Sequence, residues 1–287
     1  MADGSQHGRP LVRYHGGKWR LAPWIIANFP KHRVYVEPFG GGGAVLLRKP
    51  RTYAEIYNDL DGEIVNLFRV ARDNGLELAR VLRMTPFART EFELSYKRAR
   101  SRLEQARRTV VRSFMGFGSA AICGEVSGFR ANSNRSGTTP AQDWRNYPDA
   151  LESIIERLQG VVIERRDAVD VMRAHDAEDA LHYVDPPYVH ATRSDKRRNT
   201  VTRKAYKHEM ADADHVELAR VLRTLRGMVV LSGYPCELYR ELYPDWVRVE
   251  HASHADGARA RVECLWFNDA AQDHRISVGL FDRIAVA

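Results

Sequence analysis

The chain has 287 residues, of which 44% are hydrophobic and 28% charged, and its formal net charge at pH 7 is +7. This length suffices for one large domain, or one domain with a sizeable insertion, and the basic balance favours a polyanionic partner such as nucleic acid. The three cysteines are far apart and odd in number, which argues against a disulfide framework and a structural zinc site. No apolar run could span a bilayer, and residues 1–10, which we expect to be disordered, contain no signal-peptide core. We therefore expect a cytoplasmic protein without a membrane segment or a bound metal.

The first predicted element is a buried strand over Val34–Glu37, which is followed by a glycine run at Gly40–Gly43 and an apolar helix that starts at Ala44. A second strand over Tyr53–Tyr57 and an amphipathic helix over Asp61–Arg72 come next. Strand, glycine-rich turn, helix and strand in this order predict the opening of a doubly wound α/β fold.

The strand–helix alternation then stops, and residues 76–160 are predicted to form a mostly helical insert. This insert has a basic helix over Thr90–Arg112, a loop over Gly116–Pro140 and a helix over Trp144–Leu158. The pattern resumes with strands over Val161–Glu164, Leu181–Val184 and Met228–Leu231, a helix over Ala211–Leu225, and a terminal hairpin of Val247–Glu250 and Val262–Phe267. We therefore predict one α/β domain, made of residues 11–75 and 161–270 and interrupted by the insert.

The stretch Asp185-Pro186-Pro187-Tyr188, which follows the predicted strand over Leu181–Val184, is the most informative in the chain. Two prolines end the strand and remove two backbone N–H donors, so a carboxylate, backbone carbonyls and an aromatic ring remain. This set suits an exocyclic amine on a flat heteroaromatic ring, because the amine donates to Asp185 and the Pro186 carbonyl while the ring stacks on Tyr188. The two acceptors draw the nitrogen toward sp³ geometry, so that it can attack an electrophilic methyl group. The same residues also occur in ordinary strand-ending turns.

The glycine run Gly40–Gly43 lets a ligand approach the backbone closely. It lacks the G-x-G-x-x-G spacing of a dinucleotide site, so a hydride-transfer enzyme is disfavoured, and a nucleoside-type ligand or a plain flexible turn remains. Asp59 follows roughly 20 residues later, where it can accept hydrogen bonds from ribose hydroxyls or cap the next helix. Asp167 stands after the strand over Val161–Glu164 and has the same two possible roles. Paired glycines within Tyr14–Lys18 suggest a turn that presents side chains to a ligand, although surface turns use them as well.

Two basic runs flank the proposed amine site, one in the insert and one directly after Tyr188. Such runs are often solvated faces, but their position here favours neutralisation of nucleic-acid phosphates. The residues that we expect to contact the nucleic acid are Arg98, Arg102, Arg107, Arg108, Arg112, Arg130, Arg135, Arg197, Arg198 and Lys204.

Together, Tyr14–Lys18, Val36–Gly42, Asn58-Asp59, Asp167 and Asp185–Tyr188 resemble the motifs of the Dam-like (D12 class) DNA adenine-N6 methyltransferases, in an order that resembles the α group. The resemblance implies a Rossmann-like class I methyltransferase sheet, with residues 76–160 as the target-recognition insert. It also implies S-adenosylmethionine as cofactor. The positions that match cofactor contacts of the family are Tyr14, Lys18, Glu37, Phe39, Gly40, Gly41, Asp59, Asp167 and Asp185.

The resemblance further implies site-specific methylation of N6 on an adenine that is flipped out of double-stranded DNA, with no metal. The catalytic residues would be Asp185, Pro186, Pro187 and Tyr188, and we expect a monomer or weak dimer. The chemistry of these residues also suits other planar amines, namely cytosine N4, adenine N6 in RNA or a glutamine amide. A catalytically inactive DNA-binding relative is the remaining alternative.

Overall fold

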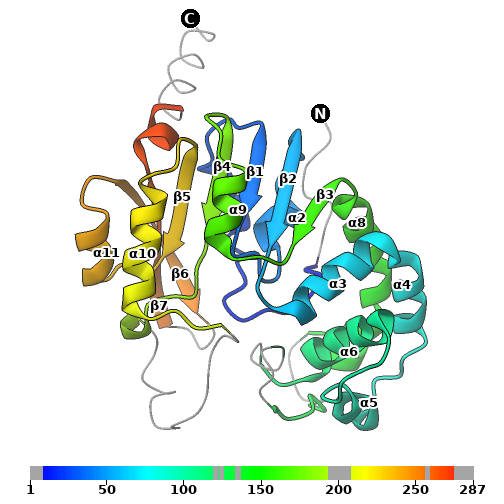
Figure 1. Ribbon diagram of the computed structural model, residues 1–287. Helices are drawn as coiled ribbons and strands as arrows, with labels where there is room; N and C mark the ends of the chain where they lie inside the picture. The colour runs from blue at the N-terminus through cyan, green and yellow to red at the C-terminus, as the bar shows by residue number, and fades with distance from the viewer. Residues whose placement is uncertain are drawn as a thin grey trace, which may run out of the picture.

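The computed structural model describes residues 9–118, 122, 126–132, 137–192, 208–255 and 259–274. Within these residues, seven strands form one sheet in the order β3-β2-β1-β4-β5-β7-β6 (Figure 1). Their bounds are Val34–Glu37 for β1, Ala54–Asn58 for β2, Val161–Glu164 for β3, Ala180–Val184 for β4, Met228–Gly233 for β5, Val247–Ala255 for β6 and Arg259–Phe267 for β7. The strands from β3 to β5 run parallel, whereas β7 is antiparallel to both β5 and β6. The expected α/β sheet and its terminal hairpin are therefore confirmed.

Helices cover both faces of the sheet. The helices that pack on one face are α1 (Ala22–Ala27), α2 (Ala44–Arg48), α3 (Gly62–Asp73) and α8 (Tyr147–Leu158), while α9 (Ala168–Ala174), α10 (Asp212–Leu222) and α11 (Glu237–Leu242) cover the other (Figure 1). Every residue of the central strands β4 and β5 is buried, which explains why both read as continuous apolar runs in the sequence.

The remaining helices extend the molecule beyond β3 (Figure 1). They are α4 (Gly75–Arg83), α5 (Arg89–Leu94), α6 (Arg102–Met115) and α7 (Pro140–Arg145). Helix α3 packs against α4, α6 and α8. Val110 of α6 and Leu151 of α8 belong to the same apolar core as Tyr35 of β1. The helical part is therefore anchored on α3 and shares the core of the sheet.

Two expected helices are each divided in the structure. The helix expected over residues 90–112 is divided into α5, which ends at Leu94, and α6, which starts at a cap where Ser101 accepts from the Glu104 backbone N–H at 3.2 Å. The helix expected over residues 144–158 is broken because Pro148 fits only the first turn of a helix, where α8 begins. Helices α1 and α11 were not predicted at all.

Other sequence-based expectations concern cysteines and membrane segments. Cys236 and Cys264 are free thiols, and Cys123 lies outside the described residues. Along the part of the chain that the structure describes, every helix is too short or too polar to cross a bilayer.

Candidate active site

The carboxyl ends of the parallel strands meet at one edge of the sheet, and the segments that follow them line a single pocket. Glu37 ends β1, Asp59 follows β2, and Asp185 follows β4. The N-terminal turn reaches the same pocket, because Tyr14 and Lys18 also line it. Of the residues expected to bind the cofactor or the amine, those in the lining are Tyr14, Lys18, Glu37, Phe39, Gly40, Gly41, Asp59, Asp185, Pro186 and Pro187. This edge is where open α/β sheets bind ligands.

The glycine loop forms the floor of the pocket and is held by neighbouring groups. The Gly40 N–H donates to the Asn58 carbonyl at 2.8 Å, and the Tyr57 hydroxyl donates to the Gly41 carbonyl at 2.6 Å. A Cβ atom on Gly40 would overlap the Tyr57 ring. Gly41 has a φ of 47°, and a Cβ atom there would lie 2.8 Å from the Tyr14 ring. Both positions therefore require glycine.

Asp59 ties this loop to the start of α3. Its Oδ2 accepts from the Gly41 N–H at 2.8 Å, and its Oδ1 accepts from the Asp61 N–H at 2.7 Å. The helix cap is Asp61, whose carboxylate accepts from the Glu63 N–H at 2.9 Å. Burial raises the pKa of Asp59. Because each carboxylate oxygen can accept more than one hydrogen bond, Asp59 can still receive hydroxyl groups of a ligand.

Glu37 is a nearly completely buried carboxyl at the base of the pocket, with 3% exposure. Its Oε2 accepts from the Tyr35 hydroxyl at 2.7 Å and from the Leu46 N–H, in the first turn of α2, at 3.0 Å. Burial raises the pKa of Glu37 to about 8. At neutral pH the side chain is therefore mostly protonated and supports the start of α2 without adding a full charge to the pocket.

Asp185 lies on the wall of the pocket with its two oxygens held from different sides. Oδ1 accepts from the Ser232 hydroxyl at 2.6 Å, and Oδ2 lies 3.0 Å from the Lys18 ammonium. Lys18, which is 6% exposed, also donates to the Gly16 carbonyl at 3.0 Å. The Asp185 side chain keeps 18% of its surface exposed, so a ligand in the pocket can still reach it.

Tyr188 is close to Asp185 but lies beneath the pocket and outside its lining. The ring is 7% exposed, and the Lys18 ammonium lies over it at 4.5 Å from the centroid. Its hydroxyl donates to Glu263 of β7 and lies 3.4 Å from the Ser232 hydroxyl. The structure thus brings Tyr188 to the site through hydrogen bonds, with little of the ring open to a ligand.

Asp167 does not reach the pocket. It is exposed, and its carboxylate caps α9 by accepting from the Val169 N–H at 2.9 Å. The next residue, Ala168, is the one that lines the pocket. The cap role that the sequence left open is therefore the one seen in the structure.

Sequence reasoning missed Ser232 and Glu263, although both contact the Asp185–Tyr188 stretch. One signal was present, because Glu263 interrupts an otherwise apolar predicted strand and buried charged residues require partners. It also missed His208, Glu209 and Met210, which complete the pocket. Among the residues that the structure describes, no cluster of His, Cys, Asp and Glu could hold a metal ion.

Arg107 and Arg108, which the sequence predicts to contact DNA, pair with carboxylates of the helical part. Arg107 lies 2.7 Å from Glu91 and 2.7 Å from Glu104, and Arg108 lies 2.7 Å from Glu104. Hydrogen bonds from these arginines lower the pKa of Glu104 to about 2. Both guanidinium groups are therefore engaged within the helical part, where Arg107 links α6 to α5 through Glu91.

Arg112, which the sequence also predicts to contact DNA, is likewise engaged by other groups of the protein. It is 3% exposed, lies 2.6 Å from Glu63 of α3, and places its guanidinium 5.7 Å from the centre of the Tyr96 ring. Its ion-pair partner Glu63 is distant in sequence, so the pattern of the basic run alone could not predict this contact.

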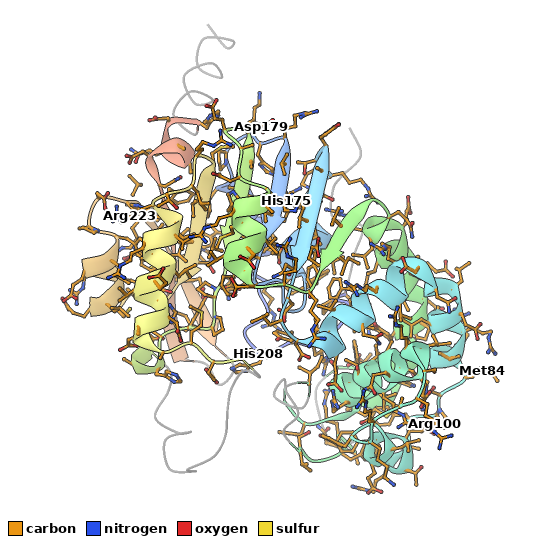
Figure 2. The ribbon with its side chains drawn as sticks, in the orientation of Figure 1. Met84, Arg100, His175, Asp179, His208 and Arg223 are labelled. Atoms are coloured by element: carbon orange, nitrogen blue, oxygen red, sulfur yellow. The ribbon has the colours of Figure 1, made fainter. Side chains whose placement is uncertain are left out.

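Three of the other expected DNA contacts fall within the described residues. Arg98 and Arg102 are exposed, but Figure 2 shows Arg100, which lies between them in sequence, on the outer side of the helical part, away from His208. Arg130 is half-buried in a second cavity, which shares Tyr14 and other residues with the pocket. Arg135, Arg197, Arg198 and Lys204 lie outside the described residues.

Comparison with known proteins agrees with this geometry. A family model described as D12 class N6 adenine-specific DNA methyltransferase matches residues 14–256. The chain is 27% identical to the Type II methyltransferase M1.LlaDCHI of Lactococcus lactis subsp. cremoris, over 88% of this chain and 90% of that protein. It is 27% identical to a DNA adenine methylase of Haemophilus influenzae, over 63% of this chain and 64% of that protein. It is 23% identical to a DNA adenine methylase of Salmonella typhi, over 82% of this chain and 84% of that protein.

Proposed function

This chain belongs to the D12 class of N6 adenine-specific DNA methyltransferases, and from that membership we propose how its residues carry out the reaction. S-adenosylmethionine and the target adenine share the pocket at the carboxyl edge of the sheet. Asp185 and the Pro186 carbonyl hold the adenine N6 amine. The observation that carries this proposal is the position of Asp185, which is exposed to the pocket, fixed by Ser232 and Lys18, and followed by two prolines.

The side chains of the pocket fit S-adenosylmethionine. Asp59 has acceptor capacity left for ribose hydroxyls, and the glycine loop lets a ligand lie against its backbone. The carboxylates of Asp59 and Asp185 suit a ligand that carries a positively charged ammonium and sulfonium, and Lys18 suits its carboxylate. When bound, S-adenosylmethionine supplies an electrophilic methyl group.

Asp185 and Pro186 prepare the adenine amine for methylation. The N6 group donates one hydrogen bond to the Asp185 carboxylate and one to the Pro186 carbonyl. Pro186 and Pro187 both line the pocket and have no N–H group that would compete with the amine. Because both acceptors hold the hydrogens, the nitrogen lone pair is localised and directed away from them. Most of the rate enhancement then comes from positioning.

Tyr188 contributes in two ways under this proposal. Its hydroxyl holds the turn by donating to Glu263. Stacking of the adenine on its ring requires the Lys18 ammonium to leave the ring face, because the ring is 7% exposed and Lys18 lies 4.5 Å from its centroid. We therefore include a shift of the Lys18 side chain when the base enters.

The second cavity suggests the path of the DNA. It adjoins the pocket and is lined by Arg13, Arg130 and Phe117, which is 66% exposed. Cationic side chains bind phosphates, and an exposed aromatic ring can contact bases that unstack. We propose that duplex DNA lies along this cavity and that the target adenine leaves the stack to enter the pocket, at a cost of a few kcal/mol.

The test is methylation of unmodified duplex DNA, followed by digestion to nucleosides and mass spectrometry of the product. We expect N6-methyladenine from the wild type and a loss of at least about 100-fold in rate for Asp185→Ala. The control is Asp170→Ala, which removes an exposed carboxylate of α9 and should leave the rate unchanged. N4-methylcytosine as the product, or normal turnover by Asp185→Ala, would refute the proposal.

A further inference from the structure

Glu263 is a buried carboxylate that the mechanism described so far uses only as the acceptor of the Tyr188 hydroxyl. It is 2% exposed and is followed in β7 by Cys264 and Leu265, both completely buried. Burying a charged group costs free energy unless other groups pair with it. The presence of Glu263 in an apolar strand therefore points to specific partners.

The sheet topology places Glu263 beside the proposed catalytic residues. Asp185 directly follows Val184, which lies opposite Leu231 of β5, so Asp185 reaches the Ser232 side chain. Ser232 in turn lies opposite Leu265 of the antiparallel strand β7. Glu263 shares the face of Leu265 and lies nearer the carboxyl end of β5. Asp185, Ser232 and Glu263 thus form a polar row across three neighbouring strands.

The contacts of Glu263 reach both groups next to Asp185. The Tyr188 hydroxyl donates to Glu263 Oε1. The Lys18 ammonium lies 3.9 Å from the same oxygen and 3.0 Å from Asp185 Oδ2, so Lys18 stands between two carboxylates. Ser232 closes the network, since its hydroxyl donates to Asp185 and lies 3.4 Å from the Tyr188 hydroxyl.

We propose that Glu263 is a positioning residue for methyl transfer: its carboxylate fixes the Tyr188 hydroxyl and attracts the Lys18 ammonium, and through both it fixes Asp185. This inference rests on the function proposed above for Asp185. In a buried network, the loss of one charged partner alters the position of the others, because no solvent replaces the lost contact. Glu263 itself does not line the pocket, so it acts without touching the substrate.

Two substitutions separate the roles of the Glu263 side chain. Glu263→Gln keeps an oxygen that can accept from Tyr188 but removes the negative charge that faces Lys18. Glu263→Leu removes both. At saturating S-adenosylmethionine, we expect the single-turnover rate to fall roughly 10-fold for the first variant and roughly 100-fold for the second. S-adenosylmethionine affinity should weaken in the same order, because Lys18 and Asp185 also serve that ligand. The thermal midpoint of Glu263→Gln should equal that of the wild type.

A double-mutant cycle tests whether Glu263 acts through Tyr188. Tyr188→Phe removes only the hydroxyl. This substitution should therefore lower the rate less in the Glu263→Leu variant than in the wild type. Glu250→Gln is the matched control, because Glu250 lies on the neighbouring strand β6, is exposed and pairs with Arg248. This control should methylate DNA at the wild-type rate.

The outcomes distinguish this inference from the proposed function. Equal rates for the wild type and Glu263→Leu, with N6-methyladenine as product of both, would overturn the positioning role and leave the proposed function standing. Full activity of Glu263→Gln per folded molecule would overturn the role proposed for the negative charge that faces Lys18. A wild type that forms no N6-methyladenine would overturn the proposed function, and this inference with it.

Discussion

Two carboxyl groups of the pocket, Glu37 and Asp185, have different surroundings and therefore different properties. Glu37 is held by a phenol and a backbone N–H and is deeply buried, so its pKa rises to about 8. Asp185 lies 3.0 Å from the Lys18 ammonium and keeps 18% of its surface open to the pocket. Glu37 is thus suited to support the start of α2, while Asp185 is suited to accept hydrogen bonds from a substrate amine.

Glu37 should make the free energy of unfolding depend on pH. The unfolded carboxyl loses its proton near its ordinary pKa of 4.5, whereas the folded carboxyl keeps it up to about 8. Between these values the folded state binds more protons, so the stabilisation present below pH 4.5 is lost as the pH rises to 8. Because glutamine does not titrate, the Glu37→Gln variant does not lose this stabilisation as the pH rises. Urea unfolding at pH 5, 6.5 and 8 should show the unfolding free energy of the variant rising relative to that of the wild type by about 1.4 kcal/mol per pH unit at most. A pH-independent difference would contradict the assignment.

At the residue scale, the sequence predicted those site residues that stand at strand ends within local motifs. Asp59 and Asp185 were found because each follows a clear apolar strand. Contacts between distant segments were not predictable in this way. Arg112 was predicted to contact DNA because its sequence neighbours do not reveal its partner Glu63, which lies on another helix. In the same way, the sequence around Tyr188 does not reveal that its hydroxyl donates to Glu263 of β7.

At the scale of elements, the strands were predicted well and the helices of the insert less well. Parallel strands buried on both faces are continuous apolar runs, which short windows detect. The start of α6 is marked instead by the hydroxyl of Ser101, a single residue inside a basic run that otherwise favours one helix. Helix ends that are set by single side chains leave little trace in the hydrophobic pattern.

The turn between β1 and α2 should not tolerate a side chain at Gly40. In Gly40→Ala the new methyl group would overlap the Tyr57 ring, whose hydroxyl also holds the Gly41 carbonyl. We expect a loss of about 1–3 kcal/mol in unfolding free energy, and weaker S-adenosylmethionine binding by calorimetry, because the loop must shift. Gly128→Ala is the control, since a Cβ atom there would have no neighbour within 4 Å. Equal stability of the two variants would show that the loop adapts freely.

At the scale of the whole molecule, the net charge of +7 does not identify the surface that binds DNA. Part of the positive charge is engaged internally, because Arg107 and Arg112 pair with carboxylates of neighbouring helices and Arg108 pairs with Glu104 of its own helix. Helix α6 is about 20 Å long, so the exposed residues Arg98, Arg100 and Arg102, which lie before or at its start, stand far from the end that leads to Phe117. The cavity beside the pocket is therefore the stronger candidate for contact with phosphates near the target base.

Arg130 and Arg100 should therefore contribute differently to DNA binding. Arg130 lines the cavity beside the pocket, whereas Arg100 lies on the outer side of the helical part (Figure 2). Arg130→Ala should weaken binding to duplex DNA and lower the slope of log affinity against log salt by about 1, because one phosphate contact is lost. Arg100→Ala removes the same charge and should change neither quantity, as measured by fluorescence anisotropy at several salt concentrations. The reverse result would place the DNA on the turn that precedes α6, and the duplex would then have to pass along the outer side of the helical part.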